Sequence, residues 1–217
     1  MTITLYHFPA ACSRVTMNAL EEIGLAYQDI AVNMRTSEQK SLDYLSINPK
    51  GKVPALDVDG RIMTENAAIL WFLHTRYPDA ALLPADDDPR VAHQGLIDLV
   101  WCSGTIHPMV RQIRMPAKWT TDDPAGVKVD GMEKLAQECS AIADRIGEDW
   151  WYGSRWSIID TYIYWAYSTA AKGGFALDRY PTLLAHAERV RARPAFLRAL
   201  AREQAALDGM GVADLML

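Results

Sequence analysis

The chain has 217 residues, of which 50% are hydrophobic and 23% charged, with a formal net charge of −5 at pH 7. This is the composition of an ordinary globular protein, and the acidic balance without a basic run disfavours binding to nucleic acid or to an anionic membrane. The three cysteines, Cys12, Cys102 and Cys139, are far apart and show no zinc-type spacing, so we expect no metal site. The first residues lack a signal-peptide pattern and no apolar stretch is long enough to span a membrane, which together with the cysteine usage predicts a cytoplasmic protein.

The first third of the chain reads as an α/β unit. Apolar runs and turn residues predict its elements in the order βαβαββα, which is the thioredoxin-like order. Ser13 suits the N-cap of the first helix, Gly24 suits its end, and Asp59-Gly60 suits a hairpin turn. The predicted elements are a strand at 2–8, a helix at 13–24, a strand at 27–32, a helix at 37–46, a hairpin of 53–58 with 61–63, and a helix at 65–77.

The rest of the chain is predicted to be helical. Residues 79–89 have the proline, alanine and aspartate composition of a linker, and strand signals stop beyond it. The predicted helices cover 90–114, 125–147, 157–172, 181–191 and 194–207. We therefore expect an α/β plus all-α protein, with a thioredoxin-like domain at 1–78 and an all-helical domain at 90–217.

The segment from Asn48 to Asn66 carries the most specific pattern in the chain. A short strand begins at Val53-Pro54, and if this peptide bond is cis, the main-chain groups of Val53 face outward as an edge with which a peptide can pair. Glu65 and Asn66 follow at the start of a helix, where main-chain amides attract carboxylates and the Glu65 carboxylate can hold an ammonium group. The pattern is typical of a site for a small peptide that bears both charges at one end.

Cys12 and Ser13 lie where the first strand passes into the first helix. The positive end of the helix dipole stabilises a thiolate at such a position. Either Cys12 or the Ser13 hydroxyl can therefore act on sulfur chemistry, although each also has a purely structural explanation. Cys12 is not part of a C-x-x-C pair, which argues against a thioredoxin-type disulfide reductase.

These motifs strongly resemble those of the cytosolic glutathione S-transferase family, in particular its bacterial, beta-like type, and the resemblance covers nearly the whole chain. It implies that Val53, Pro54, Glu65 and Asn66 bind glutathione, that Lys52 (or Arg35 or Lys40) contacts the glycyl carboxylate, and that Ser157–Asp160 is a structural capping motif. It further implies a homodimer, a role in detoxification, and a helical domain that forms the pocket for the second substrate.

The resemblance also assigns a site role to His107, which would polarise the thiol or contact the second substrate. The next residue departs from that class because it is Pro108, which should interrupt the helix.

The activity that the resemblance implies is activation of the glutathione thiol for attack on an apolar electrophile. Three alternatives stay open: a thiol transferase or disulfide reductase that uses Cys12 as nucleophile, a glutathione-dependent isomerase, and a non-catalytic glutathione-binding scaffold on the same fold.

Overall fold

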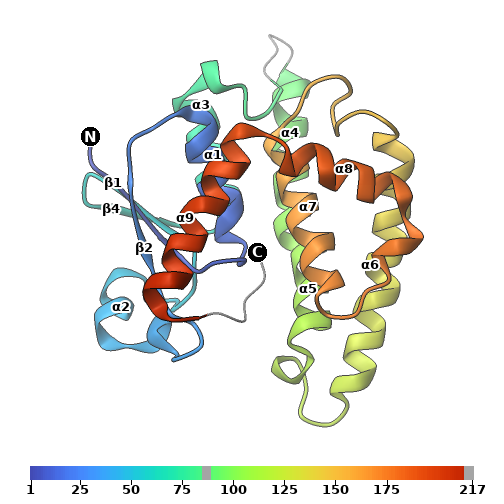
Figure 1. Ribbon diagram of the computed structural model, residues 1–217, viewed down its shortest axis with the longest axis horizontal. Helices are drawn as coiled ribbons and strands as arrows, with labels where there is room; N and C mark the ends of the chain where they lie inside the picture. Colours follow the sequence, from blue (N-terminus) through green and yellow to red (C-terminus); the bar gives the residue numbers. More distant parts are fainter. Residues whose placement is uncertain (85–88, 213–217) are drawn as a thin grey trace. The chain divides into compact units, whose positions relative to one another are not determined.

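The computed structural model describes residues 1–84 and 89–212 (Figure 1). Contacts between residues divide the chain into two units. The first combines Met1–Ala80 with the chain from Arg193 onward, and the second is Ala81–Ala192.

The first unit is built on a four-stranded sheet in the order β2-β1-β3-β4. Strand β1 pairs in parallel with β2 and antiparallel with β3, and β3 pairs antiparallel with β4. The strand bounds are β1 Ile3–His7, β2 Gln28–Ala31, β3 Ala55–Val58 and β4 Arg61–Thr64. The helices of this part are α1 Ser13–Ile23, α2 Leu42–Ile47 and α3 Asn66–Arg76. The predicted thioredoxin-like arrangement is confirmed.

Local sequence signals explain where these elements turn. Asp59 and Gly60 both have positive φ, 53° and 85°, as a two-residue hairpin turn of type I′ requires. Gly24 ends α1 in the left-handed conformation, as predicted, and its N–H donates to the Leu20 carbonyl. In the middle of the sheet, Leu5 on β1 lies between Asp29 on β2 and Leu56 on β3, and both leucines are fully buried.

The single helix predicted at 37–46 is wrong. The structure has a 3₁₀ turn at Glu38–Lys40 followed by α2, and Ser41 separates them in an extended conformation. The Ser41 hydroxyl accepts a hydrogen bond from the Tyr44 N–H at 3.2 Å, so this serine acts as the N-cap of α2. Ser41, which lies inside the helix predicted at 37–46, therefore marks the start of the shorter helix α2.

Helix α9, Pro194–Met210, belongs to the first unit, whereas the sequence placed all of 90–217 in one helical domain. It packs along α1, as Figure 1 shows for the red and blue helices. Charged pairs accompany this packing: Arg198 and Arg202 both bond to Glu21 of α1, and Arg202 also bonds to Asp29 of β2 at 2.6 Å. A helix remote in sequence thus covers the α/β core.

The described residues of the second unit form helices and the loops that join them, with one isolated β-bridge between Trp150 and Gly153. It contains α4 Pro89–Trp101, α5 His107–Arg114, α6 Pro124–Ile146, α7 Ile158–Ala171 and α8 Pro181–Arg191. The long helix predicted at 90–114 is divided into α4, a π-helical segment at Cys102–Ile106, and α5. Pro108 lacks an N–H and crowds the carbonyl four residues earlier, which explains why regular α-helical bonding is interrupted here.

The predicted capping motif at the start of α7 is also confirmed. Asp160 accepts hydrogen bonds from the main-chain N–H and the hydroxyl of Ser157, at 2.8 and 2.9 Å. The other Asp160 oxygen accepts from the Trp151 N–H at 2.8 Å and lies 3.1 Å from Nε2 of His186 on α8. Two of these contacts hold the fully buried carboxylate to the start of its own helix at Ser157, and the other two connect α7 to Trp151 and His186.

We predict that the charged contacts between α9 and the sheet unit weaken in acid. Contact with His7, followed by Arg202, holds the pKa of Asp29 below its ordinary value. Burial would raise the pKa of Glu21, but hydrogen bonds from Arg198, Tyr27 and Arg202 outweigh it, and the net shift is downward. Depressed carboxylate pKa values contribute stability above the unfolded-state pKa, near 4, and this stability is lost as the pH falls through the folded-state values.

Arg202→Met should therefore lower the free energy of unfolding by about 1–3 kcal/mol at pH 7. The deficit relative to the native chain should be smaller at pH 3 than at pH 7, because the stability that depressed carboxylate pKa values contribute is lost as the pH falls. Urea denaturation at both pH values measures this deficit. The control is Arg61→Met, which replaces an exposed arginine at the start of β4. A deficit of equal size at both pH values would contradict this role of the network.

Candidate functional site

Helix α1 begins at Ser13, as predicted, but its N-cap residue differs from the prediction. Cys12, not Ser13, is its N-cap residue, and Cys12 already has helical dihedral angles. The Ser13 side chain is fully buried, and its hydroxyl donates to the Phe8 carbonyl at 3.1 Å while accepting from the Phe8 N–H at 3.2 Å. Ser13 therefore fastens the first turn of α1 to the end of β1, and its hydroxyl is turned inward.

Glu203 of α9 fixes the loop on both sides of Cys12. Its fully buried carboxylate accepts from the Ala10 N–H at 3.0 Å and from Nε of Arg14 at 2.7 Å. Ala10 has a φ of 62°, which is uncommon for a residue with a side chain. The buried ion pair thus secures an otherwise unfavourable loop conformation next to the cysteine.

The Cys12 thiol faces the Val53-Pro54 segment. Its side chain is half-buried, and its sulfur lies 3.6 Å from the Val53 carbonyl oxygen, to which the thiol donates. The Val53–Pro54 peptide bond is cis. Tyr44 and Asn48 each donate a side-chain hydrogen bond of 2.7 Å to the Lys52 carbonyl, so the chain leading into Val53 is firmly held. Cys12 and Val53, which the sequence predicted for the site on separate grounds, thus lie in contact.

Glu65 occupies the position immediately before α3, which begins at Asn66. Its φ of 70° is unusual for glutamate and turns the chain sharply out of β4. The Glu65 carboxylate is 64% exposed and accepts a hydrogen bond of 2.7 Å from the Lys50 ammonium group. Such an exposed pair contributes at most about 1 kcal/mol, so another ammonium group can replace it at low cost. The sequence analysis missed Lys50, although it lies two residues before the predicted Lys52.

The Asn66 side chain points into the protein. It is buried, its Nδ2 donates to the Cys12 carbonyl at 2.7 Å, and its Oδ1 accepts from the Thr16 hydroxyl at 2.6 Å. What Asn66 offers outward is its main-chain N–H in the first turn of α3, where amides have no partner within the helix.

Two of the cationic candidates, Lys40 and Lys52, lie near Gly51, where the main chain packs closely against the segment that contains Gln39 and Lys40. This glycine has a φ of 57°, and a Cβ there would lie 2.7 Å from the Gln39 carbonyl oxygen and 2.8 Å from Nζ of Lys40. Only glycine fits this position without rearrangement. Lys40 therefore lies beside the chain at Gly51 and Lys52, and the Lys52 side chain is exposed.

His107 belongs to the second unit, where it opens α5 directly after the π-helical segment. Its Nδ1 lies 3.4 Å from the Tyr162 hydroxyl, and its ring meets Trp165 edge to face at 4.6 Å between centroids. Arg111 follows one helical turn later on the same face, half-buried. Within the described residues its side chain makes no hydrogen bond or ion pair.

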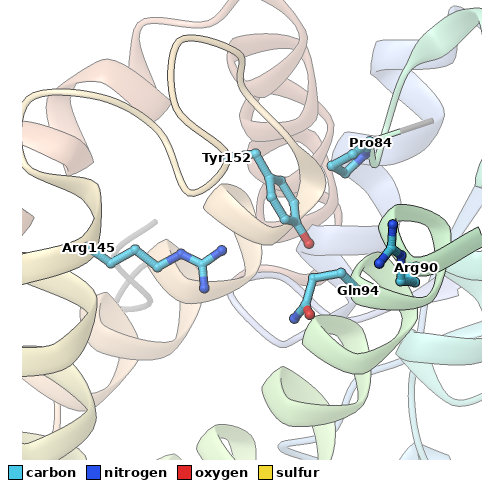
Figure 2. Close-up of a pocket in the computed structure, with 5 residues that line it drawn as sticks. All are labelled: Pro84, Arg90, Gln94, Arg145 and Tyr152. Carbon is cyan, nitrogen blue, oxygen red and sulfur yellow. The ribbon is translucent and has the colours of Figure 1, made fainter. Parts of the chain in front are cut away.

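A separate pocket of about 420 Å³ lies elsewhere in the second unit (Figure 2). Its lining consists of Pro84, Arg90, Gln94, Arg145 and Tyr152. Behind it, the buried Asp98 accepts hydrogen bonds from Gln94 at 2.8 Å and from the Tyr152 hydroxyl. None of the residues predicted for the site lines this pocket.

Residues 1–84 and 89–212 contain neither a membrane-spanning helix nor a metal-binding cluster. No helix there has the length and hydrophobicity that crossing a membrane requires. No group of three histidine, cysteine or acidic side chains is arranged to hold a metal ion.

Comparison of the sequence with known proteins identifies the family of this chain. Residues 1–75 match the family model of the glutathione S-transferase N-terminal domain. The chain is 33% identical to a maleylacetoacetate isomerase of Pseudomonas aeruginosa, over 92% of this chain and 95% of that protein. It is 28% identical to the glutathione S-transferase GstA of Escherichia coli O157:H7, over 92% and 98% of the two chains.

A solved structure agrees with these relatives. A sphingomonad glutathione S-transferase complexed with glutathione is 30% identical and superposes with a TM-score of 0.80, covering 93% of this chain and 98% of that one. The chain belongs to the glutathione S-transferase family.

We predict that Cys12 is the one cysteine that reacts rapidly in the folded protein. Burial, followed by the charge of Asp98, raises the pKa of Cys102 well above its ordinary value, and burial raises that of Cys139 to about 12. Neither thiol therefore forms the reactive thiolate at neutral pH. Titration with a disulfide reagent should release one equivalent per folded chain and three in denaturant, and Cys12→Ser should abolish the first. Rapid release of more than one equivalent by the folded chain would contradict the assignment.

Proposed function

We propose that this protein is a glutathione-dependent isomerase that converts a cis-configured, maleyl-type acid into its trans isomer. The relative that carries this proposal is the Pseudomonas aeruginosa maleylacetoacetate isomerase, because the similarity extends over both units. A second maleylacetoacetate isomerase, from Aspergillus fumigatus, is 29% identical over 93% of this chain. Conjugation of glutathione to an apolar electrophile is the competing activity, and the similarity to a relative named glutathione S-transferase, GstA, keeps it open.

The residues of the first unit fit glutathione. The Glu65 carboxylate accepts a hydrogen bond from the Lys50 ammonium group, which supports a role for it in holding the amino group of the γ-glutamyl end. Main-chain amides at the start of α3, including that of Asn66, suit the carboxylate at the same end. The main chain of Val53, before Pro54, suits the peptide portion.

The remaining two ends of glutathione are assigned by chemistry. We place the glycyl carboxylate near Lys52 and Lys40, which supply positive charge on either side of Gly51. We place the thiol at the first turn of α1 beside Cys12, because the Ser13 hydroxyl is buried and committed to Phe8.

When bound, glutathione supplies a thiolate that adds to the conjugated double bond and leaves after rotation about the resulting single bond. The contribution of the chain is to keep this sulfur ionised. A thiol pKa that is lower by two units corresponds to about 2.7 kcal/mol of differential stabilisation. The amides and dipole at the start of α1, together with the Cys12 thiol as donor, are suited to provide it.

The second unit offers groups suited to an anionic acceptor. Arg111 carries a positive charge without a partner in the described chain, one turn from His107. A guanidinium binds a carboxylate with two parallel hydrogen bonds, and a maleyl acid presents carboxylates that an apolar electrophile lacks. The His107 imidazole is of a type suited to hold or move a proton of such an acceptor.

We predict that the purified protein isomerises a maleyl acid while the glutathione concentration stays constant. An isomerase returns the thiol in each turnover, whereas conjugation consumes one glutathione for each product. The assay follows loss of the cis isomer and free thiol together, with the diacid, its neutral diester and an aryl halide as substrates. The diacid should react fastest. Stoichiometric loss of glutathione, or turnover of the aryl halide alone, would favour the conjugating transferase.

The same assay with Cys12→Ala separates the roles of the two sulfurs. If glutathione is the nucleophile, this variant should retain isomerase activity with a raised thiol pKa. Complete loss of activity, together with an adduct of one glutathione on the native chain in intact-mass analysis, would instead support a thiol transferase in which Cys12 is the nucleophile.

We predict that Glu65→Gln weakens glutathione binding by about 1.5–3 kcal/mol, the range for a hydrogen bond to a charged group. Calorimetry measures the dissociation constant, and Lys50→Met is the matched control. That variant removes the same ion pair from the other side, so it should bind glutathione at least as tightly as the native chain. Unchanged affinity in Glu65→Gln would remove Glu65 from the site.

Three further expectations from the family resemblance stay predictions: the cytoplasmic location, the role in detoxification and the homodimer. The exposed Ile97 and Val100 lie one turn apart on α4 and offer an apolar face that a second copy of the chain could cover.

A further inference from the structure

Asn66 connects the beginnings of two helices through its side chain. Nδ2 donates to the Cys12 carbonyl at the start of α1, and Thr16, one turn further along α1, donates to Oδ1. Asn66 itself is the first residue of α3. Asn66 is 5% exposed and Thr16 is fully buried, so the hydrogen bond between them lies away from water, while the hydrogen bond to the half-buried Cys12 is partly buried.

We propose that Asn66 is a positioning residue for the thiol rather than a contact to glutathione through its side chain. The proposal rests on the proposed function, in which the start of α3 binds the γ-glutamyl carboxylate and the start of α1 binds the thiol. The amide fixes the spacing between these two helix starts. It thereby sets the distance between the anchored end of glutathione and the place where its sulfur must be ionised.

The chemistry of an amide suits this task. The Cys12 carbonyl needs a donor and the Thr16 hydroxyl needs an acceptor, and a primary amide presents one of each on a single rigid group. A carboxylate would offer no donor to the carbonyl. An alanine would leave the buried Thr16 hydroxyl without its acceptor and the Cys12 carbonyl with only the hydrogen bond from the Val15 N–H. The Cys12 carbonyl can only accept, so it requires Nδ2 to face Cys12, and the Thr16 hydroxyl supports that orientation by donating to Oδ1.

Loss of the amide should therefore affect reactivity more than affinity. In Asn66→Ala the main-chain N–H of residue 66 remains for the ligand, but the first turn of α1 loses its side-chain hydrogen bond to the start of α3. We expect the pKa of the bound glutathione thiol, and that of the Cys12 thiol in the free protein, to rise by about one unit. We expect kcat to fall on the order of tenfold, with a smaller change in the KM for glutathione.

The experiment measures the pH profile of Cys12 alkylation in the free protein, the thiolate absorbance of bound glutathione, and kcat and KM. Variants are Asn66→Ala, Thr16→Val and the double variant. Thr16→Val removes only the orienting hydroxyl, so it should shift both pKa values in the same direction by less, and the double variant should resemble Asn66→Ala. Ile69→Ala is the control, since this fully buried residue of α3 contributes to packing without contacting Cys12 or Thr16 through a hydrogen bond.

Three results would overturn the inference. Asn66→Ala with native pKa values and kcat but weakened glutathione binding would make the side chain a ligand contact. Additive effects of Asn66→Ala and Thr16→Val would show that the two residues do not act as one unit. An equal shift in Ile69→Ala would trace the effect to general loosening of α3. If the native chain does not bind glutathione, the proposed function fails, and the Cys12 alkylation profile still decides the role of Asn66.

Discussion

The buried carboxylate of Glu203 is the constraint on which the candidate site depends. It lies on α9, far along the chain from Cys12, yet it bonds to Ala10 and Arg14 on the two sides of that cysteine. Burying an ion pair is costly, and removing one partner typically destabilises a protein by about 3–5 kcal/mol. The carboxylate therefore connects α9 to the α/β core and also fixes the loop next to Cys12. In this loop Ala10 has a positive φ, and Cys12 faces Val53.

Two more side chains hold the same turn from other directions. Ser13 fastens it to the end of β1, and Asn66 fastens it to the start of α3. A main chain held by three elements cannot adjust when a ligand arrives, and this is the condition under which helix amides stabilise a developing or resident negative charge effectively. The rigidity of the first turn of α1 is thus a consequence of packing between elements, and no single motif in the sequence encodes it.

This explains which features the sequence could predict. Turns and helix ends depend on local chemistry, so Asp59-Gly60, Gly24 and the Ser157–Asp160 motif were placed correctly. The order of strands followed from the order of these elements. The membership of α9 in the first unit could not be read in the same way, because it depends on pairs such as Glu21 with Arg198 that are remote in sequence. Side-chain direction was equally hidden: the positive φ of Glu65 leaves its carboxylate near Lys50, while Asn66 turns inward.

For the proposed function, conjugation and isomerisation are distinguished by how the electrophilic acceptor is bound and not by how the glutathione thiol is ionised. Conjugation and isomerisation need the same ionised sulfur, so the start of α1 and its three supports cannot distinguish them. The difference lies in whether the adduct is retained or the sulfur leaves again, and this depends on groups that hold the acceptor by its charges while the bond rotates. A carboxylate fixed by a guanidinium such as Arg111 is anchored at one end and free to turn at the other, which an apolar pocket alone does not provide. The second unit, with α5 beginning at a π-helical break, is therefore where the specificity of this family member is expected to be determined.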